Sequence, residues 1–176
     1  MIRSTFGARR LDAAARFAML FKPPNFLKEH SMNARIFDRL ALVARVNPAS
    51  VAPGTADSDA VDMSGFRRAL FALAAGAIGA GGSVDFTLQS AAAPGGPFSD
   101  VPGKAIATLT QAGGGSNQQA LIEIRADELP DGARYVRGRV TIATAASLVA
   151  VIALAGEPRF APVDGQDLAS VAQTIG

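Results

Sequence analysis

Apolar and polar residues alternate along several short stretches of the chain, a pattern typical of β-strands with one buried face. The stretch Ser83–Ser90 places Val84, Phe86 and Leu88 on one face and polar residues on the other, and Tyr135–Ala143 alternates in the same way. Shorter segments of this kind predict strands over Leu40–Val46, Val61–Met63, Phe98–Val101, Lys104–Leu109 and Gln119–Arg125.

Two further segments, Arg68–Ala75 and Leu148–Leu154, are apolar on both faces and are predicted to be central strands. The alanine and leucine content of the first also permits a helix, but it is short and bounded by glycines, which favours a strand. A Gly/Ala connection, Gly76–Gly82, leads from it into Ser83–Ser90. We therefore expect Arg68–Ala75 and Ser83–Ser90 to be neighbouring antiparallel strands.

About eight short strands separated by turn residues, with no alternation of strands and helices, predict an all-β fold. The expected architecture is an antiparallel β-sandwich, either jelly-roll or immunoglobulin-like. The predicted domain covers residues 32–157, opens with a helical turn in Asn33–Arg39, and treats Val51–Asp59 as a loop. Residues 158–176 are expected to form a C-terminal tail or arm, with a short helix at Gln166–Thr174.

The first 31 residues differ in charge from the remainder of the chain. They hold six basic and two acidic residues, a net of +4, which leaves 11 basic (17 − 6) and 13 acidic (15 − 2) residues elsewhere, a net of −2. Pro23-Pro24 ends any helix in this segment, and Lys28-Glu29 can be encoded as AAG-GAG, which resembles a ribosome-binding site before Met32. We expect residues 1–31 to be a non-native or disordered extension.

The chain offers few groups for catalysis. It contains no cysteine, and its one histidine, His30, lies in the doubtful N-terminal segment. Gly76–Gly82 is followed by a strand pattern and not by a helix, so it does not fit a phosphate-binding loop. We predict no enzymatic activity and no cofactor. The remaining alternative is a hydrolase that uses carboxylates such as Asp57, Asp59, Asp62 and Asp85.

Asp57, Asp59 and Asp62 are also weak candidates for a calcium site, because carboxylates at alternate positions can converge on a cation. The segment lacks the glycine and the distal glutamate of an EF-hand loop, which favours a solvated acidic loop.

Arginines and aromatic residues supply the candidate partner-binding surface. Arg137 and Arg139 share a strand face with Tyr135, a polar patch that could dock an acidic partner or simply be solvated. Tyr135 follows the turn Leu129–Gly132, which also suggests a structural tyrosine corner. The full set of predicted partner-binding residues is Arg67, Arg68, Tyr135, Arg137, Arg139 and Phe160.

Several stretches between residues 40 and 162 resemble a set of small proteins encoded beside the major capsid genes of tailed bacteriophages and prophages. The matching stretches are Val51–Thr55, Val61–Phe66, Gly79–Phe86, Leu88–Ser90, Phe98–Val101 and Tyr135–Arg137. The resemblance implies a capsid decoration or cement protein, made in the bacterial cytoplasm and located on the virion. It carries over no catalytic residue.

The expected partners are therefore the major capsid protein or another virion protein, together with further copies of the chain. The mildly acidic body predicts no nucleic-acid partner, and the apolar run Phe17–Phe21 is too short for a membrane span. An alternative function is a host-surface or glycan-binding module on the phage head or tail, with Tyr135, Gln118 and Gln119 as its contact residues.

Overall fold

The computed structural model describes residues 35–160 and 162–175. The expectations for residues 1–31 lie outside the described part of the chain. Residues Arg35–Gly176 group into one compact unit, which therefore includes the C-terminal tail as well as the predicted β-domain.

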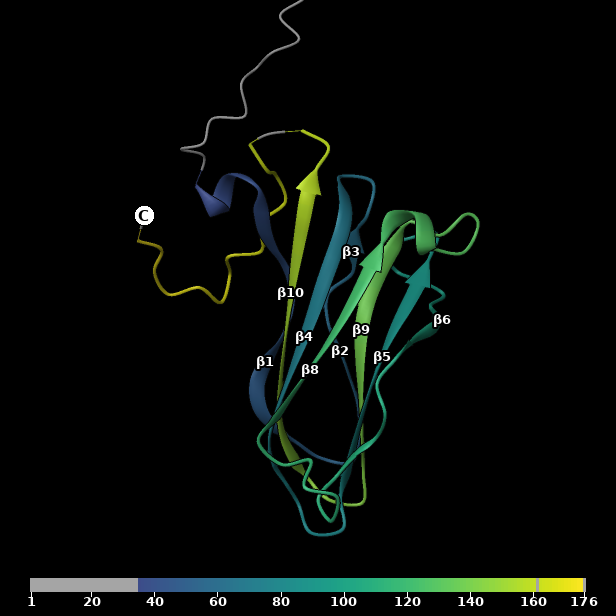
Figure 1. The fold of residues 1–176 in the computed structure, drawn as a ribbon, viewed down its shortest axis with the longest axis vertical. Helices are drawn as coiled ribbons and strands as arrows, with labels where there is room; N and C mark the ends of the chain where they lie inside the picture. Colours follow the sequence, from purple (N-terminus) through teal and green to yellow (C-terminus); the bar gives the residue numbers. More distant parts are fainter. Residues whose placement is uncertain (1–34, 161, 176) are drawn as a thin grey trace, which may run out of the picture. The chain divides into compact units, whose positions relative to one another are not determined.

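The described residues form two antiparallel sheets that pack face to face (Figure 1). Sheet A has the strand order β1-β10-β4-β8, and sheet B has the order β2-β9-β5-β6, with β3 also paired to β9 and β7 to β5. The strands are β1 (Leu40–Val51), β2 (Gly54–Asp57), β3 (Val61–Asp62), β4 (Phe66–Ile78), β5 (Ser83–Ala91), β6 (Ser99–Ala105), β7 (Leu109–Thr110), β8 (Gln118–Arg125), β9 (Tyr135–Ala143) and β10 (Ser147–Pro158). Two short 3-10 helices are η1 (Ile36–Asp38) and η2 (Ala126–Glu128).

The pairing between strands is nested. The first strand pairs with the last (β1 with β10), β2 and β3 pair with β9, β4 pairs with β8, and β5 pairs with β6 and β7. Counting β2–β3 and β6–β7 as one interrupted strand each, eight strand positions wind into a jelly roll. The structure thus confirms the all-β antiparallel sandwich and selects the jelly-roll alternative over the immunoglobulin-like one.

The predicted pairing of Arg68–Ala75 with Ser83–Ser90 is wrong. The first segment belongs to β4 in sheet A, between β10 and β8, and the second belongs to β5 in sheet B, beside β9. The glycine-rich connection crosses from one sheet to the other, and its residue Gly79 lies so close to the β9–β10 turn that a Cβ would be 2.6 Å from the Ala146 carbonyl oxygen. The central positions predicted for β4 and for Leu148–Leu154 in β10 are confirmed.

Other boundaries differ from the prediction for local reasons. β1 continues past Asn47-Pro48 to Val51, because the register with β10 shifts there and an edge strand tolerates the missing proline N–H. The predicted loop Val51–Asp59 contains β2, and the predicted strand Lys104–Leu109 is broken after Ala105. Residues 166–174 form no helix.

The core lies between the inward faces of the two sheets. Phe71 from β4 and Phe86 from β5 are fully buried there. They meet over Gly138 of β9, where a Cβ would lie 2.9 Å from Phe86 Cε2 and 3.2 Å from Phe71 Cδ1. The absent side chain at Gly138 therefore makes room for the two rings.

Gly138→Ala should lower the free energy of unfolding by about 1–3 kcal/mol, because the added methyl group overpacks the ring contact. Gly65→Ala is the matched control, since nothing lies within 4 Å of a Cβ at that position. Urea denaturation of both variants measures the difference, and equal stabilities would contradict this account of the core.

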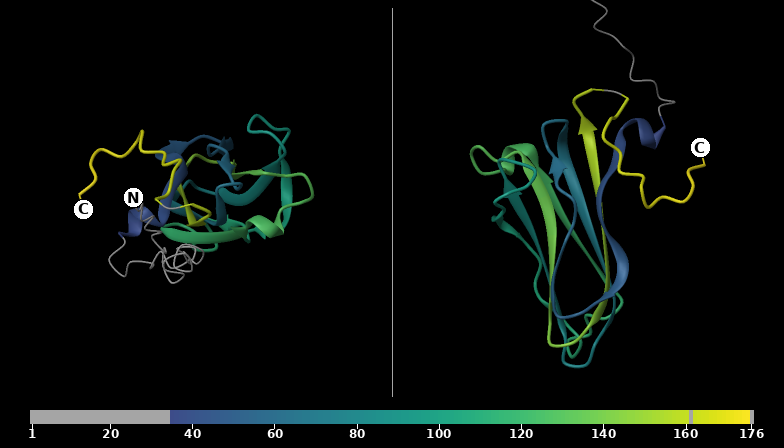
Figure 2. Two further views of the ribbon diagram at one scale, coloured as in Figure 1. Left: turned by 90° about the horizontal axis from the view of Figure 1, so that it is seen from above. Right: turned by 180° about the vertical axis from the view of Figure 1, so that it is seen from behind.

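The C-terminal tail lies along the free edge of β1 (Figure 2). The Asp167 N–H donates to the Leu42 carbonyl oxygen at 2.6 Å, and the Asp167 carboxylate forms an ion pair with Arg45. Val163 adds a buried side chain to the core, at 8% exposure. The tail thus covers part of a sheet edge that would otherwise present unpaired backbone groups.

Asp167→Asn should lower the free energy of unfolding by about 1 kcal/mol, because it removes the charge from a half-buried ion pair. It should also accelerate hydrogen exchange at the residue-167 amide. Asp164→Asn, an exposed change in the same tail, serves as the control. Unchanged exchange in the Asp167 variant would show that the ion pair does not hold the tail on β1.

Candidate functional site

The structure divides the six predicted partner-binding residues into two separate groups. Arg67 and Arg68 lie on β4 in sheet A, and Phe160 follows the end of β10 in the same sheet. Tyr135, Arg137 and Arg139 lie on β9 in sheet B. The predicted set is therefore two surfaces with different surroundings, and each is considered by itself.

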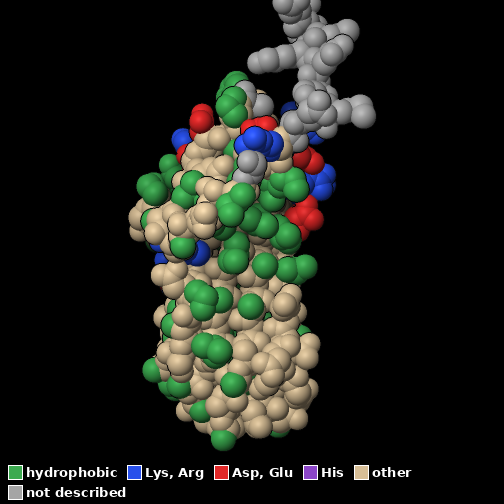
Figure 3. Space-filling model, turned by 90° about the vertical axis from the view of Figure 1, so that its left-hand side faces the viewer, with side chains coloured by type: hydrophobic (Ala, Val, Ile, Leu, Met, Phe, Trp, Pro, Cys, Tyr) green, Lys and Arg blue, Asp and Glu red, His purple; other side chains and the backbone are tan. Residues whose placement is uncertain are grey.

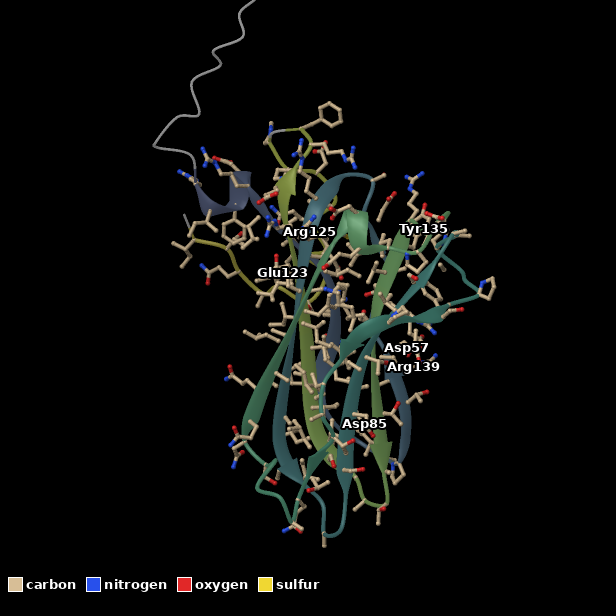
Figure 4. The ribbon with its side chains drawn as sticks, turned by 45° about the vertical axis from the view of Figure 1, so that its right-hand side comes forward. Asp57, Asp85, Glu123, Arg125, Tyr135 and Arg139 are labelled. Carbon is tan, nitrogen blue, oxygen red and sulfur yellow. The ribbon has the colours of Figure 1, made fainter. Side chains whose placement is uncertain are left out.

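On β9, Arg137 and Arg139 both bind Asp57 of β2. Arg139 donates from Nε and Nη2 to the two carboxylate oxygens at 2.7 and 2.8 Å, and Arg137 Nη1 lies 2.9 Å from Asp57 Oδ2. Figure 4 shows Asp57 and Arg139 side by side. The hydrogen bond from Arg139 lowers the pKa of Asp57, more than burial raises it, so the carboxylate stays charged at neutral pH.

Arg137 extends this contact across sheet B. Its Nε and Nη2 donate to Gln89 Oε1 of β5 at 3.1 and 2.9 Å, and Gln89 Nε2 donates to Asp100 of β6 at 2.8 Å. The Arg137 guanidinium also stacks on the Phe98 ring, 4.1 Å from its centroid. The polar side chains thus connect β2, β9, β5 and β6, which makes them ties within the sheet rather than a free docking patch.

Tyr135 lies at the start of β9, where the Arg134 guanidinium stands 5.4 Å from its ring centroid. Its hydroxyl forms no hydrogen bond with any other residue that the structure describes. A tyrosine corner requires such a bond to the backbone. Tyr135 therefore occupies a corner position without the defining contact.

The candidate calcium and hydrolase carboxylates do not converge. Asp57 binds the two β9 arginines, Asp62 binds Arg134 with Nε 2.7 Å from Oδ1, and Asp85 accepts a hydrogen bond from Thr108. Within residues 35–160 and 162–175, no group of three or more potential ligands could hold a metal ion. The structure accounts for Asp57 and Asp62 as arginine partners.

The Asp62–Arg134 pair gives a pH-dependent signature. The hydrogen bond from Arg134 lowers the pKa of Asp62 to about 2. Because this is below the unfolded value of about 3.9, the pair stabilises the fold above pH ~4 and stops doing so as the pH falls through about 2.

Arg134→Gln should raise the Asp62 pKa toward about 3.9, as followed by NMR titration of the side-chain carboxyl carbon. Its unfolding free energy should fall below that of the wild type at neutral pH and converge with it near pH 2. Arg139→Gln is the control, because it acts on Asp57 and should leave the Asp62 titration where it was. An unshifted Asp62 pKa in Arg134→Gln would rule out the assigned cause.

The second group belongs to an arginine rim, which we define as Arg67, Arg68, Arg125 and Arg159. Together with Ala126, Asp127 and Glu157, these residues line a hollow of about 530 Å³ at the charged end of sheet A. Arg67 and Arg68 come from the first residues of β4, and the Arg159 N–H donates to the Gly65 carbonyl oxygen at 2.9 Å, which holds the end of β10 beside them. Three segments far apart in the sequence therefore build one basic hollow.

The rim is only partly neutralised. Arg68 pairs with Glu123 at 3.1 Å and with Glu157 at 3.0 Å, and Arg125 pairs with Asp127. Neither Arg67 nor Arg159 forms a salt bridge with any residue in the described part of the chain. Next to Arg159, the Phe160 side chain is 82% exposed. Two arginines without a salt bridge among the described residues thus line the hollow, and an exposed aromatic residue directly follows one of them in the chain.

Sequence reasoning missed Arg125 and Arg159 as members of this surface. Both stand at strand ends, and only the pairing of β4 with β8 and β10 brings these ends together. The proposed glycan contacts separate instead: Tyr135 begins β9 at the charged end, whereas Gln118 and Gln119 begin β8 at the opposite end. They cannot form one binding patch.

Comparison with known proteins does not assign the chain to a family. No protein-family model matches it, and neither does any curated protein sequence. Among the described residues, no helix is long and apolar enough to cross a membrane.

Proposed function

We propose that this chain is a non-enzymatic structural component of a tailed-phage virion, which decorates or cements the capsid by binding the major capsid protein or another virion protein. The arginine rim and Phe160 are the contact surface in this proposal, and an acidic region of the other protein is the surface they recognise.

The observation that carries the proposal is that Arg67 and Arg159 line one hollow without a salt-bridge partner among the described residues, with the exposed Phe160 directly after Arg159. Arginine and aromatic side chains are enriched at protein–protein contacts and among the residues that dominate binding energy. Unpaired guanidinium groups also bind carboxylates through two parallel hydrogen bonds. The rim therefore offers the chemistry of an acidic protein contact.

Two further features support a structural role. The jelly roll presents the rim on a rigid scaffold, because the arginines stand on strand ends and not on long loops. The resemblance to proteins encoded beside phage capsid genes supplies the virion as the setting. A cement protein acts by binding the assembled state preferentially, which stabilises that state by mass action.

The proposal is tested with phage particles assembled from a genome in which this gene is deleted. Purified wild-type chain should cosediment with these particles and raise the temperature at which they release DNA. Arg67→Gln and Arg159→Gln should each weaken binding by roughly tenfold, and binding should weaken with added salt. Phe160→Ala should weaken it independently of salt.

Arg134→Gln is the matched control. Arg134 is also an exposed arginine, but it already pairs with Asp62 of β3, in the other sheet. It should bind particles as the wild type does. Absence of the chain from mass spectra of wild-type virions, or equal binding by the rim variants and the control, would refute the proposal.

A further inference from the structure

The outward face of sheet A carries exposed apolar side chains, in addition to the ion pairs Arg45–Asp167 at β1 and Arg68–Glu123 near the arginine rim. Along β10, Val149, Val151, Ala153 and Ala155 point into the core, while the intervening Leu148 and Ile152 remain 45% and 49% exposed. On β8, Leu121 is 64% exposed. An antiparallel sheet in a sandwich normally carries polar residues on its solvent-facing side. The exposed aliphatic side chains therefore give this face the composition of a contact surface.

Charge is missing from the connections at the end of the domain to which this face leads. No Asp, Glu, Lys, Arg or His occurs in residues 46–56, 69–84, 105–122 or 140–156. These four stretches are the β1–β2, β4–β5, β7–β8 and β9–β10 connections with the adjoining strand halves, and nested pairing brings them to one end. We call this end, together with the neighbouring part of sheet A that carries Leu121, Leu148 and Ile152, the charge-free half; in Figure 3 the charged side chains gather at the opposite end.

The surface of the charge-free half also contains hollows. A hollow of about 380 Å³ opens on the outward face, lined by Pro48, Ala74, Gly76, Gln119, Leu148 and neighbouring residues. A second hollow of about 220 Å³ lies between Ile152 and the tail residues Ser170 and Val171, at the edge of the charge-free half, where Arg45 pairs with Asp167. Leu121 projects beside the first hollow, on the strand that contributes Gln119 to its lining. One face thus carries both a protruding aliphatic group and a recess of small residues.

The missing charge indicates that the occupant is a second copy of this chain. In a contact around a rotation axis, each side chain near the axis meets its own equivalent, so a charged group there would face a like charge. A different partner imposes no such restriction and usually carries complementary charge. The polar groups present here are amides and hydroxyls, as in Asn117, Gln118 and Gln119. Each can donate and accept, and can therefore pair with an identical group.

We propose that the chain forms a cyclic homo-oligomer in which the charge-free halves meet around the axis, with Leu121, Leu148 and Ile152 at the contact. This interface uses a surface separate from the arginine rim, so it goes beyond the virion function and does not depend on it.

The mass of the full-length chain in solution tests the proposal. Light scattering coupled to size exclusion should give a multiple of the 18.0 kDa chain mass. Ile152→Glu and Leu148→Glu should each reduce it to 18.0 kDa with an unchanged β-sheet circular dichroism spectrum, because both side chains are exposed in the single chain. Ser99→Glu, an exposed change on β6 of sheet B and outside the charge-free stretches, is the control and should keep the wild-type mass.

Cross-linking gives a readout that does not depend on charge variants. The chain contains no cysteine, so one introduced thiol can form a disulfide only with another copy. Leu148→Cys or Leu121→Cys should form covalent dimers under mild oxidation many-fold faster than Ser99→Cys. A wild-type chain that is monomeric, or cross-linking equal at all three sites, would overturn the proposal. Particle binding by the arginine rim is measured separately, so its outcome is independent of whether the chain forms an oligomer.

Discussion

The fold depends on β10, because this last strand pairs with the first strand, β1, on one side and with β4 on the other. Within sheet A it is the only strand that links β1 to β4, so without it the sheet separates into an isolated edge strand and a β4–β8 pair. Its partner on one side lies more than a hundred residues away, with Leu40 opposite Gly156. Such non-local pairing makes the jelly roll a high-contact-order fold, in which most contacts form only after long loops have closed.

The rows of core side chains that cross sheet A through β10 combine small and large residues. In the inward row that crosses sheet A, Ala44 and Ala153 precede Phe71 and Ile122, and in another row Ala41, Ala155 and Ala69 precede Ile124. In these two rows the small side chains lie toward β1 and the large ones toward β8. Gly138 in sheet B completes this arrangement by leaving room for the rings of Phe71 and Phe86. Small residues therefore stand opposite or beside large ones in the core, as dense packing requires.

The local pattern of apolar and polar residues predicted the positions of several strands, because strand formation depends largely on neighbouring residues. The alternation in Ser83–Ser90 and Tyr135–Ala143 identified β5 and β9 nearly to the residue, and the two-sided apolarity of Leu148–Leu154 identified a central strand. The pairing of strands could not be predicted in this way. β4 and β5 are adjacent in sequence, yet they lie in different sheets, because their partners depend on the topology of the whole jelly roll. The same limit applied to the site. Arg137 and Arg139 share a face as predicted, but their ion pairs with Asp57 depend on the register of β2 against β9, which no local signal encodes.

In a jelly roll, successive connections between strands lie at alternate ends of the domain. Stretches that alternate between charged and uncharged along the chain therefore form one charged end and one uncharged end. The four charge-free stretches alternate along the chain with charged ones, and the nested pairing gathers each kind at its own end. Arg67, Arg125 and Arg159 thereby come together although they occur in three separate segments, while the charge-free stretches that contain Leu121 and Leu148 meet at the other end. If the charge-free halves meet at an axis, the rims lie away from it and face outward from every copy. An oligomer built in this way would present several identical basic contacts at once, and repeated weak contacts on a regular array bind far more tightly than one contact does.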